Sequence, residues 1–166
     1  MPPALDVRLR TATFAQLDTR TLYELLRLRV DVFVVEQECA YDELDGRDLE
    51  PDTMHMWLAD PADGRPVAYL RILAEAEGMR IGRVVTVRHL RRTGLAGLLL
   101  DAALHSVAAD RVVRLHAQLS AVSLYAKRGF VAEGEVFLED GIRHIAMRRP
   151  AWTAAGHQER RNAGAR

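Results

Sequence analysis

Residues Arg91 to Gly97, with the sequence RRTGLAG, place two arginines and two glycines directly before a leucine-rich run. Apolar residues in that run recur at the spacing of an amphipathic helix, so the basic turn precedes a helix N-terminus. Backbone N–H groups at a helix N-terminus have no helical acceptors, and the positive end of the helix dipole lies there. Fixed cations at this end are therefore favourable only when an anion binds beside them. The pattern R-x-x-G-x-A matches neither a Walker loop nor a GxGxxG fingerprint. It predicts a pyrophosphate-binding turn, or else a solvated basic turn whose glycines serve its geometry alone.

A second group of chemically informative residues lies between Gln118 and Phe130, in the stretch QLSAVSLYAKRGF. Its spacing is N/Q-x-x-A-x-x-L-Y-x-x-x-G-F, in which Tyr125 is the tyrosine. A phenol with an ordinary pKa of about 10 keeps its proton at neutral pH and can protonate a leaving thiolate. Tyr125 is therefore a candidate general acid, the alternative being a half-buried aromatic side chain on a short helix.

Together these blocks resemble the Gcn5-related N-acetyltransferase (GNAT) superfamily. The first resembles its coenzyme A pyrophosphate loop, and the second resembles its fifth strand and the helix that follows. Four further segments are similar to its ElaA-like branch: LRLRVDVFVVEQECAYDELDGRD, YLRIL, IGRVV and EDGIRHIAM. The resemblance covers the chain from Thr21 to Met147.

The resemblance implies an acetyl-CoA-dependent N-acetyltransferase that passes an acetyl group to a primary amine by direct attack. It also implies a splay between strands four and five, where the pantetheine arm pairs with unpaired backbone groups. Tyr125 would be the general acid. Ala96 departs from the family, which usually has a second loop glycine there. The implied cofactor-binding residues are Val84, Val85, Thr86, Arg91, Arg92, Thr93, Gly94, Leu95, Ala96, Gly97, Gln118 and Tyr125.

The general base is not fixed by the pattern. Glu36, His55, Glu75 and His144 could accept a proton from the acceptor amine, and Glu36 and His55 are the preferred candidates. Glu36 follows the first predicted helix, where the superfamily usually builds its acceptor wall. The alternatives are a solvent-facing carboxylate for Glu36 and a hydrogen-bonded residue at a strand end for His55.

An acidic segment follows the first predicted helix. Seven carboxylates between Glu36 and Glu50 accompany a single arginine, Arg47. They predict a loop that attracts a cationic amine, or simply a solvated loop.

Hydrophobic periodicity predicts an α/β (α+β) fold with a mixed, mostly antiparallel central sheet of about six to seven strands flanked by helices. A strand-helix-strand passage from Arg80 to Leu119 implies one parallel pair. Residues 1–150 are predicted to form a single domain and residues 151–166 a flexible tail. The expected strands are 7–13, 55–59, 67–74, 80–87, 112–119, 136–138 and 142–147, and the expected helices are 18–33, 95–110 and 122–128.

The composition argues against several protein classes. Basic and acidic side chains number 23 each, so the net charge is zero and a nucleic-acid or membrane partner is not expected. Cys39 is the only cysteine, and neither a signal peptide nor a membrane span is recognised, so we expect a cytoplasmic protein. The remaining histidines lack metal-ligand spacing, so no metal is expected.

The sequence leaves the acceptor and the assembly open. The acceptor amine could belong to a small molecule or a peptide, and the chain could be a monomer or a homodimer. Two alternative functions also remain: an acyltransferase similar to acyl-homoserine-lactone synthases, and a non-catalytic coenzyme A binding or regulatory module.

Overall fold

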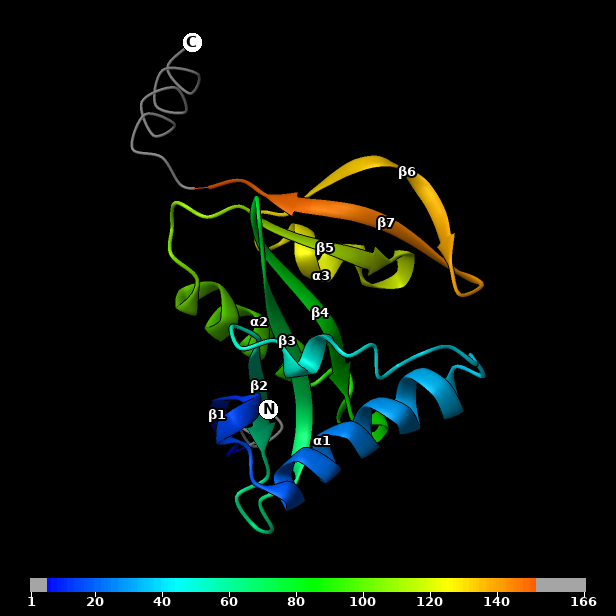
Figure 1. Cartoon of the computed structure of the whole chain (residues 1–166). Helices are drawn as coiled ribbons and strands as arrows, with labels where there is room; N and C mark the ends of the chain where they lie inside the picture. Colours follow the sequence, from blue (N-terminus) through cyan, green and yellow to red (C-terminus); the bar gives the residue numbers. More distant parts are fainter. Residues whose placement is uncertain (1–5, 152–166) are drawn as a thin grey trace.

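A computed structural model of the chain describes residues 6–151, which contain one seven-stranded sheet (Figure 1). The order across the sheet is β1-β2-β3-β4-β5-β7-β6, and every neighbouring pair is antiparallel except β4 and β5. This confirms the expected mixed sheet; the expected tail lies, apart from Ala151, outside the described residues. The strands are β1 (Arg8–Thr13), β2 (Met54–Ala59), β3 (Pro66–Glu75), β4 (Gly78–Thr86), β5 (Val113–Gln118), β6 (Val131–Glu139) and β7 (Ile142–Arg149).

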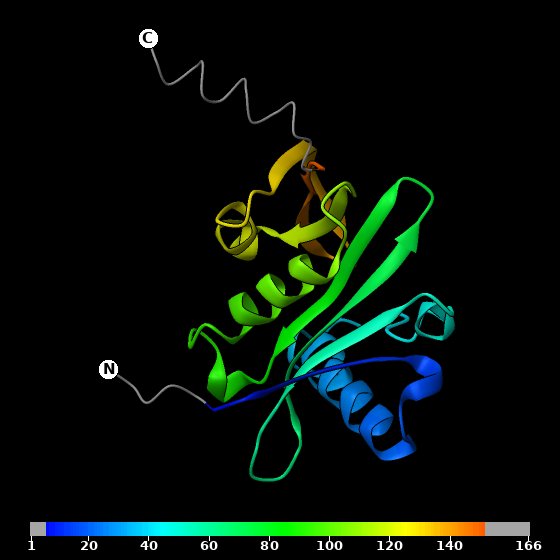
Figure 2. The same ribbon diagram turned by 90° about the vertical axis from the view of Figure 1, so that its left-hand side faces the viewer.

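Two long helices cover opposite faces of β3 and β4, with α1 on one side and α2 on the other (Figure 2). Asp18 begins α1 by accepting the Thr21 N–H at 2.9 Å, as expected of an N-cap. No helix within residues 6–151 is long and apolar enough to cross a membrane. The helices are α1 (Thr19–Val30), its π-helical continuation η2 (Asp31–Glu36), α2 (Leu95–Ser106) and α3 (Val122–Ala126), and the 3-10 turns are η1 (Phe14–Gln16), η3 (Arg47–Leu49), η4 (Arg88–Leu90) and η5 (Leu119–Ala121).

The parallel strands β4 and β5 pair at only two positions and then separate. Met79 pairs with Val113 and Arg80 with Arg114, and beyond them β4 remains bonded to β3 while β5 remains bonded to β7. Near Arg83, β4 has one residue more than the facing part of β3, and Arg83 has a positive φ of 56°. This bulge bends β4 beside β3. Figure 1 shows the two strands meeting at one end and diverging toward the other. The expected splay between strands four and five is therefore confirmed.

Strand β6 differs most from the sequence prediction. The predicted strand covered 136–138, whereas β6 begins at Val131. Its residues are mostly exposed because β6 is the edge of the sheet, so the alternation that marks a half-buried strand is missing. An irregularity between Glu133 and Phe137, with Gly134 at a φ of 78°, further interrupts the pattern.

Gly78 is the first residue of β4, at the end of the strand that pairs with β5, and it lies against the segment before β5. It has a φ of 141°, and a Cβ atom there would lie 2.3 Å from the Val112 carbonyl oxygen, which accepts the Met79 N–H. We expect Gly78→Ala to lower the free energy of unfolding by more than about 1 kcal/mol in urea denaturation. Gly82→Ala is the matched control on the same strand, because a Cβ atom has space there. Equal losses in the two variants would contradict this explanation.

Candidate active site

A cleft of about 810 Å³ occupies the space between the diverging strands. One wall is the second half of β4 and the other is the end of β5, while residues from η2, from the segment after it and from the β6–β7 hairpin line the sides. The structure thus brings together several residues that lie far apart in the sequence. The predicted site residues that line the cleft are Val84, Val85, Thr86, Arg91, Gln118 and Tyr125.

The N-terminus of α2 lies one short turn beyond the β4 wall. Arg92 and Gly94 have φ angles of 65° and 93°, so the turn uses the left-handed conformation twice. The Leu98 N–H donates to the Gly94 carbonyl at 2.9 Å, which leaves the N–H groups of residues 95–97 without helical acceptors. These donors, together with the positive end of the helix dipole, can hold an anion.

Other residues of the predicted turn have packing roles. Thr93 Oγ1 donates to the Leu90 carbonyl at 2.6 Å, and Leu95 is buried in the core. A Cβ atom on Gly97 would lie 2.4 Å from the Arg128 guanidinium. Gly97 therefore gives Arg128 room to lie across α2, where it pairs with Asp101 at 2.8 Å and so ties α2 to the segment after α3.

Arg91 and Glu36 form an ion pair at the edge of the cleft. Both carboxylate oxygens accept from the guanidinium, one of them at 2.8 Å, and Arg91 Nε also donates to the Thr86 carbonyl at 3.1 Å. The hydrogen bonds from Arg91 lower the pKa of Glu36. A carboxylate held in this way is a weaker proton acceptor, so the structure does not support the expectation that Glu36 is the general base. The charge of Arg91 is shared with Glu36 rather than left free for an anion.

Tyr125 combines a buried ring with a place on the cleft wall. The residue is 6% exposed, and its ring packs edge-on against Phe130 at a centroid distance of 6.0 Å. Burial raises the pKa of Tyr125 to about 12, so the phenol keeps its proton at neutral pH. Nearby, the Gln118 side-chain amide donates to Gln37 at 3.3 Å and joins the end of β5 to the end of η2. Tyr125 therefore lines the cleft as a protonated phenol.

His55 lies outside the cleft. Its side chain is buried on β2, with Nδ1 2.8 Å from the Tyr69 hydroxyl and Nε2 3.2 Å from the Asp48 carbonyl. Burial lowers the pKa of His55, and both ring nitrogens are already engaged. The expectation that His55 acts as the base is corrected for this reason: the residue fixes β2 to the loop that carries Asp48.

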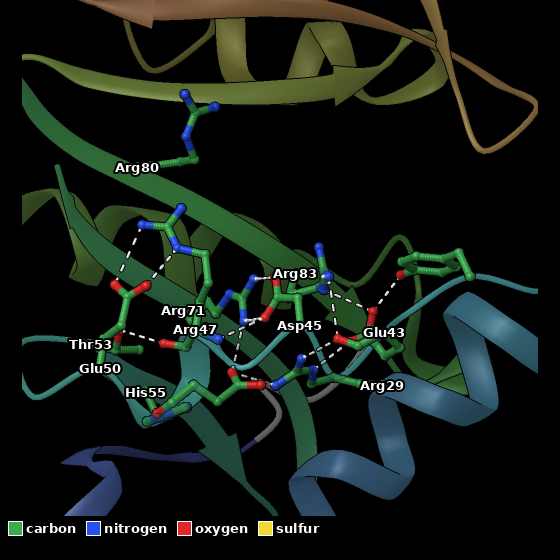
Figure 3. A network of polar contacts seen from close by, with 12 residues as sticks. Arg29, Glu43, Asp45, Arg47, Glu50, Thr53, His55, Arg71, Arg80 and Arg83 are labelled. Carbon is green, nitrogen blue, oxygen red and sulfur yellow. Dashed lines mark hydrogen bonds and ion pairs between the residues drawn. The ribbon is translucent and has the colours of Figure 1, made fainter.

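The acidic segment is held by an arginine–carboxylate network, defined here as Arg29, Arg71 and Arg83 with Glu43, Asp45 and Asp48 (Figure 3). Arg29 donates to Glu43 at 2.5 Å and to Asp48 at 2.8 Å, and all three side chains are buried. Arg71 adds bonds to both oxygens of Asp45 and one of 2.9 Å to Asp48. Figure 3 shows the guanidinium groups converging on the loop from α1, β3 and β4.

This network changes the interpretation of the acidic segment. Glu43, Asp45 and Asp48 each face an arginine, and Arg47 pairs with Glu50 at 2.8 Å, so much of the loop's charge is neutralised within the chain. The acidic segment is therefore neither a purely solvated loop nor a loop that broadly attracts cations. The sequence signal that could have found this network is an arginine among apolar neighbours, which favours buried charge without naming its partners. It occurs at Arg29 in LRLRV, Arg71 in YLRIL and Arg83 in IGRVV.

Asp45 makes the network sensitive to acid. Burial by itself would raise its pKa, but the hydrogen bonds and charge of Arg71 outweigh this and lower the pKa of Asp45 to about 2. Because the pKa of Asp45 is lower in the folded than in the unfolded state, its ionised carboxylate stabilises the fold fully above about pH 4. This stabilisation is lost as the pH falls toward about 2. We expect Asp45→Asn to be less stable than the wild type at neutral pH and to lose less further stability between about pH 5 and 3.

Urea denaturation at each pH measures this effect. Asp110→Asn, at an exposed position outside the network, should follow the wild-type pH dependence. An unchanged pH dependence in Asp45→Asn would show that Asp45 does not carry the linkage.

Comparisons with known proteins agree with this geometry. Residues 25–150 match the family model of the acetyltransferase (GNAT) domain. The chain is 49% identical over 146 residues to a UPF0039 protein of Mycobacterium tuberculosis, covering 86% of this chain and 92% of that protein. Crystal structures of an acyl-CoA N-acyltransferase from Pseudomonas aeruginosa and of Escherichia coli ElaA are similar, with 42% and 36% identity and TM-scores of 0.80 and 0.81. Each alignment covers 86% of this chain and 99% of the other. The chain therefore belongs to the GNAT acetyltransferase family, in the group that includes ElaA and the UPF0039 proteins.

Proposed function

We propose that the protein transfers an acetyl group from acetyl-CoA to a primary amine by direct attack of the amine on the thioester. The observation that carries this proposal is the cleft itself, which the open wall of β4 and Tyr125 both line. The free N–H groups at the start of α2 lie one short turn beyond that wall. An amide-containing arm lying along β4 could use the backbone groups that no longer face β5.

The residues present fit a coenzyme A group. Val84, Val85 and Thr86 offer the open edge of β4, and Thr86 Oγ1 is buried there without a hydrogen-bond partner among the described residues. Arg92 and the N–H groups of residues 95–97 would hold the pyrophosphate, with Arg91 closing the turn against Thr86. The acyl thioester would then reach the part of the cleft that contains Tyr125.

Direct transfer needs an acid for the departing sulfur and an uncharged amine nitrogen. As the nitrogen bonds to the carbonyl carbon and the C–S bond breaks, the Tyr125 hydroxyl supplies the proton that the thiolate takes. A synthase of acyl-homoserine lactones or a binding module without catalysis would use the same cleft, and product analysis separates them from the proposed activity.

Tyr125→Phe tests the acid role. We expect kcat at saturating acetyl-CoA to fall by about 10²-fold, because general acid catalysis typically contributes that much, while the Kd for acetyl-CoA stays nearly unchanged. The assay follows free coenzyme A with putrescine, spermidine, Nα-acetyl-lysine and a peptide N-terminus as acceptors, and calorimetry gives the Kd. A loss of kcat below about threefold, worth under ~0.7 kcal/mol, would reject the acid role.

Tight binding of acetyl-CoA without transfer to any acceptor would support the binding module instead. Formation of a lactone from acyl-carrier substrates would support the synthase.

Glu36→Gln separates an arginine ligand from a general base. We expect kcat to stay within about threefold of the wild type, since Glu36 binds Arg91, whereas loss of a true base would cost about 10²-fold. The affinity for acetyl-CoA should shift, because Arg91 loses its partner beside Thr86. Glu38→Gln, an exposed carboxylate two residues away, is the matched control and should change neither quantity.

A further inference from the structure

Polar and aromatic side chains gather on one face of β5, β7 and β6. Gln118 pairs with His144 across β5 and β7, and Phe137 pairs with His144 across β6 and β7. Directly paired residues share a face of the sheet, as do residues two apart in one strand. His116 and Glu139 therefore join Phe137 and His144 on this face. The buried alternate residues of β5 point the other way, into the core beneath α2.

His116 and Glu139 meet on the lining of the cleft. His116 Nδ1 lies 3.3 Å from a Glu139 carboxylate oxygen, and Phe137 packs edge-on against the imidazole at a centroid distance of 4.9 Å. A carboxylate only accepts, so in the neutral ring Nδ1 carries the proton and Nε2 keeps its lone pair. Nε2 has no hydrogen-bond partner among the described residues, and 37% of the side chain is exposed. Glu139 thus orients the imidazole of His116 at Nδ1, and Nε2 stays open.

His144 is the other imidazole of this group, and it is less open. Its Nδ1 lies 2.9 Å from the Ile142 carbonyl, its Nε2 lies 3.8 Å from the second oxygen of Glu139, and 11% of its side chain is exposed. A carbonyl only accepts, so in the neutral ring Nδ1 carries the proton and Nε2 lies beside Glu139 without donating to it. Both imidazoles line the cleft, and the His116 side chain is the more exposed of the two.

We propose that His116 is the general base for the acceptor amine and that Glu139 is the positioning residue that holds its tautomer; this rests on the acetyl transfer proposed above. His116 Nε2 accepts a proton from the acceptor ammonium and passes it to solvent, leaving a neutral amine. The amine nitrogen then bonds to the thioester carbon, the C–S bond breaks, and the sulfur takes the Tyr125 proton. The second proton of the nitrogen restores the Tyr125 phenol, so each turnover releases one proton, free coenzyme A and the amide.

The kinetic test compares two kinds of acceptor. With the most active alkyl amine of the panel above, which is protonated at pH 7, His116→Gln should lower kcat by about 10²-fold. With hydroxylamine, which is already neutral at pH 7, the loss should stay below about threefold, because no proton needs to be removed before attack. His105→Gln, at an exposed position on α2, is the control and should match the wild type with both acceptors.

A wild-type kcat in His116→Gln with the alkyl amine would overturn the proposal. So would a 10²-fold loss in His144→Gln without one in His116→Gln, which would move the role to His144.

A spectroscopic test does not depend on turnover. In long-range 1H–15N NMR spectra of the full chain labelled in its histidines, His116 should be protonated at Nδ1 in the wild type, and Glu139→Ala, which removes the acceptor, should abolish that preference. An Nε2-protonated His116 in the wild type would overturn the proposal even if the enzyme is active. If no amine is acetylated, the proposed function fails, and the tautomer still decides whether Glu139 orients His116.

Discussion

The site depends on the loss of pairing between β4 and β5 after two residues. A continuous sheet would bond these backbones to each other and leave no space between them. Here β4 stays attached to β3, and β5 stays attached to β7, so two half-sheets share one short seam near Gly78. Contacts from outside the strands must therefore hold the two half-sheets at a fixed distance from each other. The Gln118–Gln37 bond and the contact from Cys39 Sγ to the Asp140 carbonyl at 3.1 Å bridge the open side.

The arginine–carboxylate network supplies the rigid wall on that side. Its loop has few apolar residues to bury, yet Glu43 and Asp48 lie in the interior because guanidinium groups from three other elements surround them. Breaking a buried pair leaves an uncompensated charge, which typically costs about 3–5 kcal/mol. The loop is thereby fixed more firmly than its polar sequence suggests. His55 contributes to the same anchoring through the Asp48 carbonyl.

The sequence predicted the parts of the fold that local patterns encode. The amphipathic helices, the buried strands and the basic turn before α2 follow from periodicity and from the chemistry of Arg91 to Gly97. The family resemblance added the splay. Long-range partners could not be read in this way, because Arg71 and Asp45 are 26 residues apart and Arg91 and Glu36 are 55 apart. Glu36 was a reasonable candidate base from its position alone, and only its contact with Arg91 shows how that carboxylate is occupied.

The two side chains proposed for proton transfer lie on different elements, Tyr125 on α3 and His116 on β5. Tyr125 belongs to the core beneath α2, where burial raises its pKa to about 12 and keeps the phenol protonated at neutral pH. His116 lies on the more open face of β5, from which, in the role proposed for it, a proton taken from an amine would pass to water. Active sites commonly place an acid and a base in environments that separate their pKa values, and the two proposed residues differ in burial in this way. The two-residue alternation of β5 turns His116 away from the core that contains Tyr125 of α3, and both residues line the same cleft.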